Sequence, residues 1–417
     1  MRLASFLLGL QIVVTPSVGA EPPPSWDKLP KVRLADDLKF FWNVGGGDDA
    51  LNYKEAERHG FGTVEILNTF ADDPGDRKEA IHPGRLNPWA KPPFFEKAVK
   101  RNIDAELKGK RSIMVHDIEF EFEEDLDKAW ANEATRKASG VDSKEKFRTA
   151  YYKEWASWYT LPCKWAKEKN PKVPLGIYGP QPFRRDFRGR SGKDADQIDG
   201  THRTDEELWE HVDPAVDFYI TSVYCFYDDP SSVYYMASNV EGNWLRTRKY
   251  GNKPVYAYVW LRYHSGNKKL ANKELDDFLV EAAAVLPYFC GGRGLVLWGW
   301  EPKLKGQYYR TLPLFMRSLA RLEPLAEKIA KAKSANDEPA HVAWEAKRPL
   351  LRKLNVSDGE CLVLAAYPWQ KVDETRKVSV ECGGKDFELV IRGKHTEVYH
   401  IVKGTARRLN SSQHMEK

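Results

Sequence analysis

The chain has 417 residues and a formal net charge of +5, which is small for its length. This balance, without a basic tail or a known binding motif, argues against nucleic acid as the partner. A hydrophobic content of 42% is enough for a large core. The 14 tryptophans and 19 tyrosines suit sugar binding, because flat rings stack on pyranose faces, but they equally suit an aromatic core.

The first twenty residues have the pattern of a secretory signal. Arg2 precedes an apolar run at 3–14, and small residues lead to a cleavage site after Ala20. The apolar run is too short to span a bilayer comfortably. We therefore expect a secreted or periplasmic protein that does not associate with the membrane once the signal is cleaved. The proline-rich stretch at 21–35 is predicted to be a linker.

Between residues 36 and 333, apolar stretches typical of strands alternate with helical patterns. The predicted strands are 38–44, 62–70, 112–121, 174–178, 217–224, 254–262 and 294–300. Such alternation predicts parallel strands joined by helical crossovers. Seven units of this kind predict a closed, seven-stranded β/α barrel of the TIM type. An open doubly wound sheet is the alternative, but the first strand lacks a following G-x-G-x-x-G phosphate loop.

After about residue 335 the pattern changes to short alternating strands. Residues 341–403 predict a small antiparallel β-sandwich, with Gly383 and Gly384 in a hairpin turn. This unit could bind sugar, but bracing the barrel is the favoured role. Residues 404–417 are predicted to be a disordered tail.

The five cysteines are odd in number, so at least one is unpaired or joins another chain. Cys361 and Cys382 fall in neighbouring predicted strands, where they could form a disulfide. The sequence contains neither Cys-x-x-Cys nor His-x-x-x-His spacing, so we expect no metal site and no cofactor.

The third predicted strand ends in acids and carries the candidate catalytic pair. Side chains alternate across a strand, so Asp117 and Glu119 share one face. Two neighbouring carboxylates repel when both are ionised, so one should hold a proton near neutral pH and could act as a general acid. An acidic strand end that faces water is the alternative interpretation.

Chemistry in a β/α barrel takes place at the carboxyl ends of the strands. Polar or aromatic residues stand at all seven predicted ends. They are Trp42, Asn43, Glu65 or Asn68, Asp117, Glu119, Tyr178, Tyr224, Arg262 and Trp298. A single Tyr or Trp is more often part of a core, but the complete set indicates a site.

This ordered set resembles the hyaluronidase family of glycoside hydrolases over about residues 36–325. The matched segments are Phe41-Trp42-Asn43, Asp117-Ile118-Glu119, Gly176-Ile177-Tyr178, Ser222-Val223-Tyr224, more loosely Tyr258 to Arg262, and Gly294 to Gly299. The sequence departs from the family in its barrel disulfides and in Ile118, where animal members carry Trp. The resemblance is therefore distant, and a chitinase-like or hexosaminidase-like barrel remains open.

The resemblance implies retaining, substrate-assisted hydrolysis of an N-acetylhexosamine-containing, glycosaminoglycan-like polysaccharide. Glu119 would act first as general acid and then as base. Asp117 would orient the acetamido group and stabilise the charge that develops on it. The implied substrate-binding residues are Tyr178, Tyr224, Trp298, Arg262, Asn43 and Trp42.

One argument from the residues supports this mechanism independently. Asp117 and Glu119 are too close for an inverting pair, which needs about 6.5 Å or more between its carboxyl groups. A barrel that binds glycans without cleaving them, and a glycosidase with Glu65 or Glu301 as a separate nucleophile, remain alternatives.

An arginine-rich loop is predicted on the same side of the barrel, at 183–190. Its guanidinium groups could hold an anionic glycan, or they could pair with nearby aspartates in a solvated loop, and the two interpretations carry equal weight.

Overall fold

The computed structural model describes residues 26–45, 49–68, 87–90, 96–109, 111–118, 125–179, 195–271, 273–300, 309–336, 338–372 and 374–409. Within these ranges, seven parallel strands form one sheet in the order β4-β3-β2-β1-β7-β6-β5. The strands are β1 (Lys39–Gly45), β2 (Gly62–Asn68), β3 (Ile113–Asp117), β4 (Leu175–Tyr178), β5 (Tyr219–Ser222), β6 (Val255–Val259) and β7 (Gly294–Trp300).

The two ends of this sheet meet and nearly close it into a barrel. The backbone N–H of Asp217, just before β5, donates to the carbonyl of Leu175 on β4 at 2.7 Å. The predicted seven-stranded β/α barrel is thereby confirmed, and the open doubly wound sheet is excluded.

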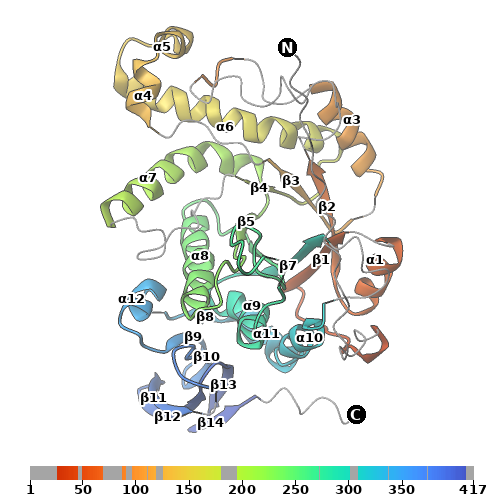
Figure 1. Ribbon diagram of the computed structural model, residues 1–417, viewed down its shortest axis with the longest axis vertical. Helices are drawn as coiled ribbons and strands as arrows, with labels where there is room; N and C mark the ends of the chain where they lie inside the picture. The colour runs from red at the N-terminus through yellow and green to blue at the C-terminus, as the bar shows by residue number, and fades with distance from the viewer. Residues whose placement is uncertain are drawn as a thin grey trace, which may run out of the picture.

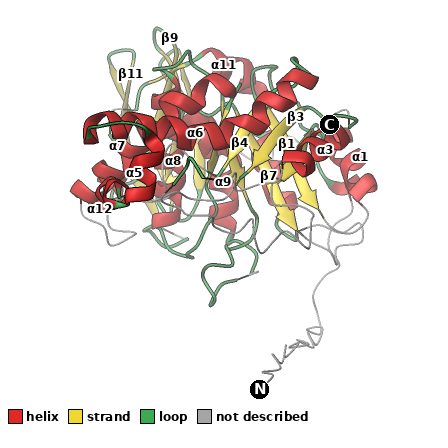
Figure 2. Ribbon diagram, turned by 90° about the horizontal axis from the view of Figure 1, so that it is seen from above, coloured by secondary structure: helices red, strands yellow, loops and turns green. Residues whose placement is uncertain are grey.

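Helices cover the outer wall of the barrel (Figures 1 and 2). The longer ones are α1 (Asp49–Arg58), α3 (Glu96–Glu106), α6 (Lys144–Lys169), α7 (Ala195–Val212), α8 (Ser231–Thr247), α9 (Asp277–Phe289) and α10 (Leu312–Ala320). The short ones are α4 (Leu126–Ala131), α5 (Glu133–Ser139), α11 (Ala326–Lys331) and α12 (Ala340–Glu345). None of the described helices is both long enough and apolar enough to cross a membrane.

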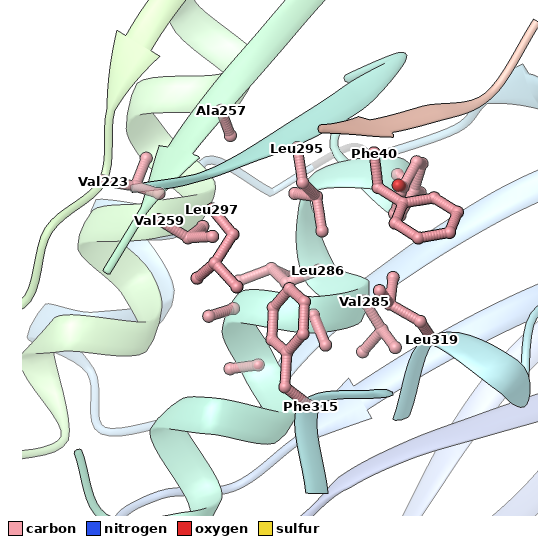
Figure 3. Close-up of a cluster of buried hydrophobic side chains, with 14 of the residues drawn as sticks. Phe40, Val223, Ala257, Val259, Val285, Leu286, Leu295, Leu297, Phe315 and Leu319 are labelled. Atoms are coloured by element: carbon pink, nitrogen blue, oxygen red, sulfur yellow. The ribbon is translucent and has the colours of Figure 1, made fainter. Parts of the chain in front are cut away.

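The packing of β7 shows which side chains face outward. Leu295 and Leu297 lie in one buried cluster with Leu286 of α9 and Phe315 of α10 (Figure 3). Because side chains alternate along a strand, Trp298 then faces the opposite side, toward the barrel interior.

Aromatic rings fill the interior near the amino-terminal ends of the strands. The ring of Tyr256 lies 5.2 Å from that of Phe41 and 4.8 Å from that of Phe218. A Cβ on Gly176 would come within 2.3 Å of the Phe218 ring, and one on Gly62 within 2.7 Å of the Phe41 ring. Glycines on β2 and β4 thus make room for the rings, which close the barrel below its mouth.

The C-terminal part is a β-sandwich that packs beneath the barrel helices (Figure 1). Among the described residues, its larger sheet has the order β14-β13-β10-β9-β8, and a hairpin of β11 and β12 forms the second layer. The strands are β8 (Lys333–Ser334), β9 (Leu350–Ser357), β10 (Glu360–Ala366), β11 (Thr375–Cys382), β12 (Lys385–Arg392), β13 (Thr396–Val402) and β14 (Thr405–Arg408). The predicted Cys361–Cys382 disulfide is confirmed and joins the two layers.

Strand β10 is buried on both faces. Leu362 and Leu364 belong to the same apolar cluster as the barrel helices α9 and α10. Val363 and Ala365, which alternate with them, belong to the cluster between the sheet and the hairpin. The sandwich therefore continues the core of the barrel.

Two predictions about connecting segments are wrong. The predicted linker is packed from Trp26 onward, since this side chain is buried and its ring lies 5.2 Å from that of Trp42. The predicted disordered tail contains β14, because a turn at Lys403 and Gly404 folds the chain back onto β13. The predicted signal at 1–20 lies outside the described residues.

Candidate active site

Four of the predicted site residues occupy paired positions at the carboxyl ends of the strands. Asn43 on β1 is the register partner of Trp298 on β7, and Asp117 on β3 is the partner of Tyr178 on β4. His116, the residue before Asp117, packs under α6 with its Nδ1 3.7 Å from the Cys163 sulfur. Asp117 therefore points to the opposite side of the strand, into the barrel mouth.

Tyr258 on β6 lies at the centre of this group. Its hydroxyl accepts a hydrogen bond from Asn43 Nδ2 at 3.3 Å, and its ring lies 5.2 Å from that of Tyr178. Burial, and then the negative charge of Asp117, raise the pKa of Tyr258 well above its ordinary value. The phenol therefore keeps its proton at physiological pH and can donate it in a hydrogen bond.

The sequence had placed Tyr258 only at the start of a loose match, without assigning it a role. The sequence feature that could have identified Tyr258 is its spacing of two residues from Tyr256 on one strand, because this spacing places both rings on the same face, inside the barrel.

An aromatic wall stands beside these polar groups. The ring of Trp298 lies 5.6 Å from that of Tyr224 and 4.8 Å, nearly perpendicular, from that of Trp260. Tyr224 is the second residue after the end of β5. Trp260, which directly follows β6, was missed because the predicted strand ran past it to Arg262. The mouth thus combines a carboxylate, a phenol and an amide with a flat apolar surface.

Trp42 does not belong to this site, and the prediction that it binds substrate is wrong. Only 1% of its surface is exposed, and its ring packs against those of Trp26 and Phe61. Alternation along β1 explains this outcome, because Trp42 and the adjacent Asn43 must face opposite sides.

Arg262 lies beyond the strand that was expected to hold it. β6 ends at Val259, and Arg262 instead forms an isolated bridge with Glu274. Its guanidinium lies over the ring of Tyr309, 5.3 Å from the centroid. The residue therefore belongs to the segment that follows β6, and its contact with a substrate stays a prediction.

Glu65 faces the outside of the barrel and is not a candidate nucleophile. Its Oε2 lies 3.4 Å from Arg111 Nε, and its carboxyl group lies next to the end of α3. Burial, and then a hydrogen bond with Glu106, raise the pKa of Glu65 to about 8. Glu119, Glu301, the side chain of Asn68 and the arginine-rich loop at 183–190 lie outside the described residues.

No group of three or more His, Cys, Asp or Glu side chains in the described ranges is arranged to hold a metal ion. The described residues of the mouth present a carboxylate, phenol groups, an amide and aromatic rings.

Comparison with known proteins gives no assignment by sequence: no family model and no curated protein matches the chain. Bee venom hyaluronidase, solved with a hyaluronic acid tetramer, is 16% identical with a TM-score of 0.45, over 70% of this chain and 100% of that one. A β-galactosidase from Rahnella sp. R3 is 11% identical with a TM-score of 0.43, over 69% and 49%. An α-L-fucosidase from Paenibacillus thiaminolyticus is 11% identical with a TM-score of 0.42, over 68% and 40%. Likeness at this level leaves the activity of this chain open.

Proposed function

We propose that this chain is a glycoside hydrolase that cleaves an N-acetylhexosamine-containing polysaccharide. The observation that carries the proposal is the Asp117 carboxylate. It points into the barrel mouth and lies in register with Tyr178. Its charge also acts on the phenol of Tyr258. A carboxylate beside a protonated phenol and an aromatic wall can bind a sugar ring and stabilise positive charge that develops on it.

Glu119 is the proposed general acid and base. The N–H of Ile118 donates to the carbonyl of Tyr178 at 2.9 Å, so β3 stays paired with β4 up to this residue. Continued alternation would put Glu119 on the same side as Asp117. Glu119 would protonate the glycosidic oxygen as its bond to the anomeric carbon breaks, and later remove a proton from the attacking water.

The nucleophile in this mechanism belongs to the substrate. The carbonyl oxygen of the acetamido group would attack the anomeric carbon, and water would then open the cyclic intermediate, so the anomeric configuration is retained. Asp117 would accept a hydrogen bond from the acetamido N–H and stabilise the positive charge of that intermediate. The outward position of Glu65 supports substrate assistance, because it removes one of the two alternative protein nucleophiles.

The other site residues would bind the sugar itself. Tyr258 and Asn43 already form a hydrogen-bonded pair that could orient the substrate at the mouth. Trp298 and Tyr224 would supply the apolar wall behind the acetamido methyl group. The substrate proposed is glycosaminoglycan-like, and the protein would meet it outside the cytoplasm after cleavage of the N-terminal signal.

The test is a digestion screen of the purified chain against hyaluronan, chondroitin, chondroitin sulfates, heparosan and chitin oligomers, with products identified by mass. Glu119→Gln should lower turnover of the cleaved glycan by at least about 100-fold, since it removes general acid–base catalysis. Glu65→Gln is the matched control, because it makes the same change in a carboxyl group on the outer face of the barrel, and it should keep activity.

Three results would count against the proposal. Unchanged turnover in Glu119→Gln would exclude this residue as the acid. A covalent glycosyl adduct on a protein carboxylate would exclude substrate assistance. A folded protein that binds one of the glycans but releases no product would identify a binding barrel instead.

A further inference from the structure

Beyond the mouth, the segments that follow β5 and β6 are joined into one rim, formed by residues 225–227 and 264–267. The N–H of His264 donates to the carbonyl of Cys225 at 2.8 Å, and Asn267 Nδ2 donates to the carbonyl of Phe226 at 2.7 Å. The N–H of Gly266 donates to His264 Nδ1 at 3.0 Å. The first two bonds tie the two segments together, and the third holds the turn within the second segment.

The aromatic wall of the site continues into this rim. The ring of His264 is stacked on that of Tyr224 at 6.0 Å and lies 4.3 Å from that of Phe226. Tyr224 in turn lies 5.6 Å from Trp298. A run of neighbouring rings therefore leads from the mouth to the outer end of the rim.

Tyr227, the residue after Phe226, is an exposed aromatic residue of the same rim. Its side chain is 44% exposed, and it is the aromatic member of the four large hydrophobic side chains that are exposed within the described ranges. Its carbonyl accepts a hydrogen bond from Ser232 Oγ at 2.8 Å, which ties its backbone to the start of α8. A large ring on a tied backbone loses little conformational entropy when a ligand binds.

We propose that Tyr227 forms a sugar-binding subsite remote from the cleaved bond. The occupant would be a further pyranose unit of the same polysaccharide, stacked by its apolar face on the phenol ring. The place of Tyr227 on the rim selects this occupant, because the rim follows directly on Tyr224 and a chain bound at Trp298 and Tyr224 can extend along it. The inference rests on the proposed function and deepens it: the enzyme binds several units of a long chain and cleaves within it.

The experiment measures kcat/KM on size-fractionated oligosaccharides of the glycan that the wild-type enzyme cleaves. Tyr227→Ala should lower kcat/KM about tenfold on the long oligomers, mainly through KM, and leave the shortest cleaved oligomer unchanged. Tyr227→Phe keeps the ring and should behave as wild type. Leu245→Ala is the matched control, because it truncates another exposed apolar residue (55%) at the far end of α8.

Two results would overturn the subsite. Equal kcat/KM for wild type and Tyr227→Ala at every length would show that the ring binds no sugar. A loss of the same size at every length would show that the ring supports Tyr224 in the mouth. A wild-type enzyme that cleaves and binds none of the glycans would overturn the proposed function first, before any variant is compared.

Discussion

His116 shows how closely the chemistry of the mouth is tied to the packing behind it. It directly precedes Asp117 and lies fully buried on the other face of β3, with Nδ1 3.7 Å from the sulfur of Cys163 on α6. Burial lowers its pKa from 6.5 to about 3, so the imidazole is neutral in the folded protein at neutral pH. Protonation of this ring would place an uncompensated charge under the strand that carries Asp117.

The stability of the protein should therefore depend on pH through His116. The unfolded chain binds a proton below pH 6.5, whereas the folded protein does so only near pH 3, so stability is complete above 6.5 and falls as the pH drops toward 3. At about pH 5 this residue should cost about 2 kcal/mol of unfolding free energy. His116→Phe should reduce the stability difference between pH 7.5 and pH 5 by that amount, as measured by urea unfolding. An identical pH dependence in the variant would contradict the assignment.

At the scale of the element, β4 depends on having no side chain at Gly176. The ring of Phe218 on the neighbouring chain segment before β5 fills this position, and an added Cβ would lie 2.3 Å from it. Phe218 in turn packs against Tyr256 on β6. The missing side chain on one strand thus allows the aromatic filling of the barrel.

Gly176→Ala should consequently destabilise the protein by about 3 kcal/mol, the upper end of the usual cost of overpacking. Phe218→Leu creates space at the same point, so the double variant should be more stable than the sum of the two single effects predicts. Urea midpoints of the four proteins give the coupling energy. Additive effects would show that the two residues do not compete for this space.

The strands were predictable, whereas their ends and faces were only partly so. The apolar run at Gly294–Trp300 could be recognised because a strand covered on both faces is apolar throughout. The predicted strand 254–262 is too long, because the run remains apolar to Leu261 whereas β6 ends at Val259. Trp42 was misplaced although alternation alone forbids it and Asn43 from facing the same side.

The central position of Tyr258 could not be predicted, because it depends on contacts between strands that are distant in the sequence. Its partner Asn43 is 215 residues away. A single sequence gives the period of each strand, but it does not give the pairing that brings β1, β4 and β6 together at the mouth.

At the scale of the whole molecule, a buried ion pair joins the sandwich to the barrel. Arg352 on β9 is only 1% exposed, and its Nη2 donates to Glu241 Oε2 on α8 at 3.0 Å. Its Nε pairs with the same carboxylate. The predicted role of the sandwich as a brace for the barrel agrees with this contact and with the apolar face of β10 that packs on the barrel.

Arg352→Met should cost about 3–5 kcal/mol, because it leaves Glu241 buried without its counter-charge. The double variant Arg352→Met, Glu241→Leu removes both charges and should recover most of this loss. Differential scanning calorimetry of the three proteins tests the point. A double variant as unstable as Arg352→Met would show that the loss comes from packing around the arginine rather than from the unpaired carboxylate.

The barrel is a sheet whose two edge strands, β4 and β5, are joined at one closure point. This closure point lies opposite β1, which occupies the middle of the sheet order. It consists of the bond from Asp217 to the Leu175 carbonyl and the reverse bond from the Leu175 N–H to the Asp217 carboxylate at 2.8 Å. Both bonds are at the amino-terminal ends of the strands, below the mouth. Above this closure point, β4 ends at Tyr178 and the segment after β5 carries Tyr224. If the two strands separate at their carboxyl ends, the distance between these two proposed sugar contacts would change, while the aromatic rings at the amino-terminal ends keep the barrel closed.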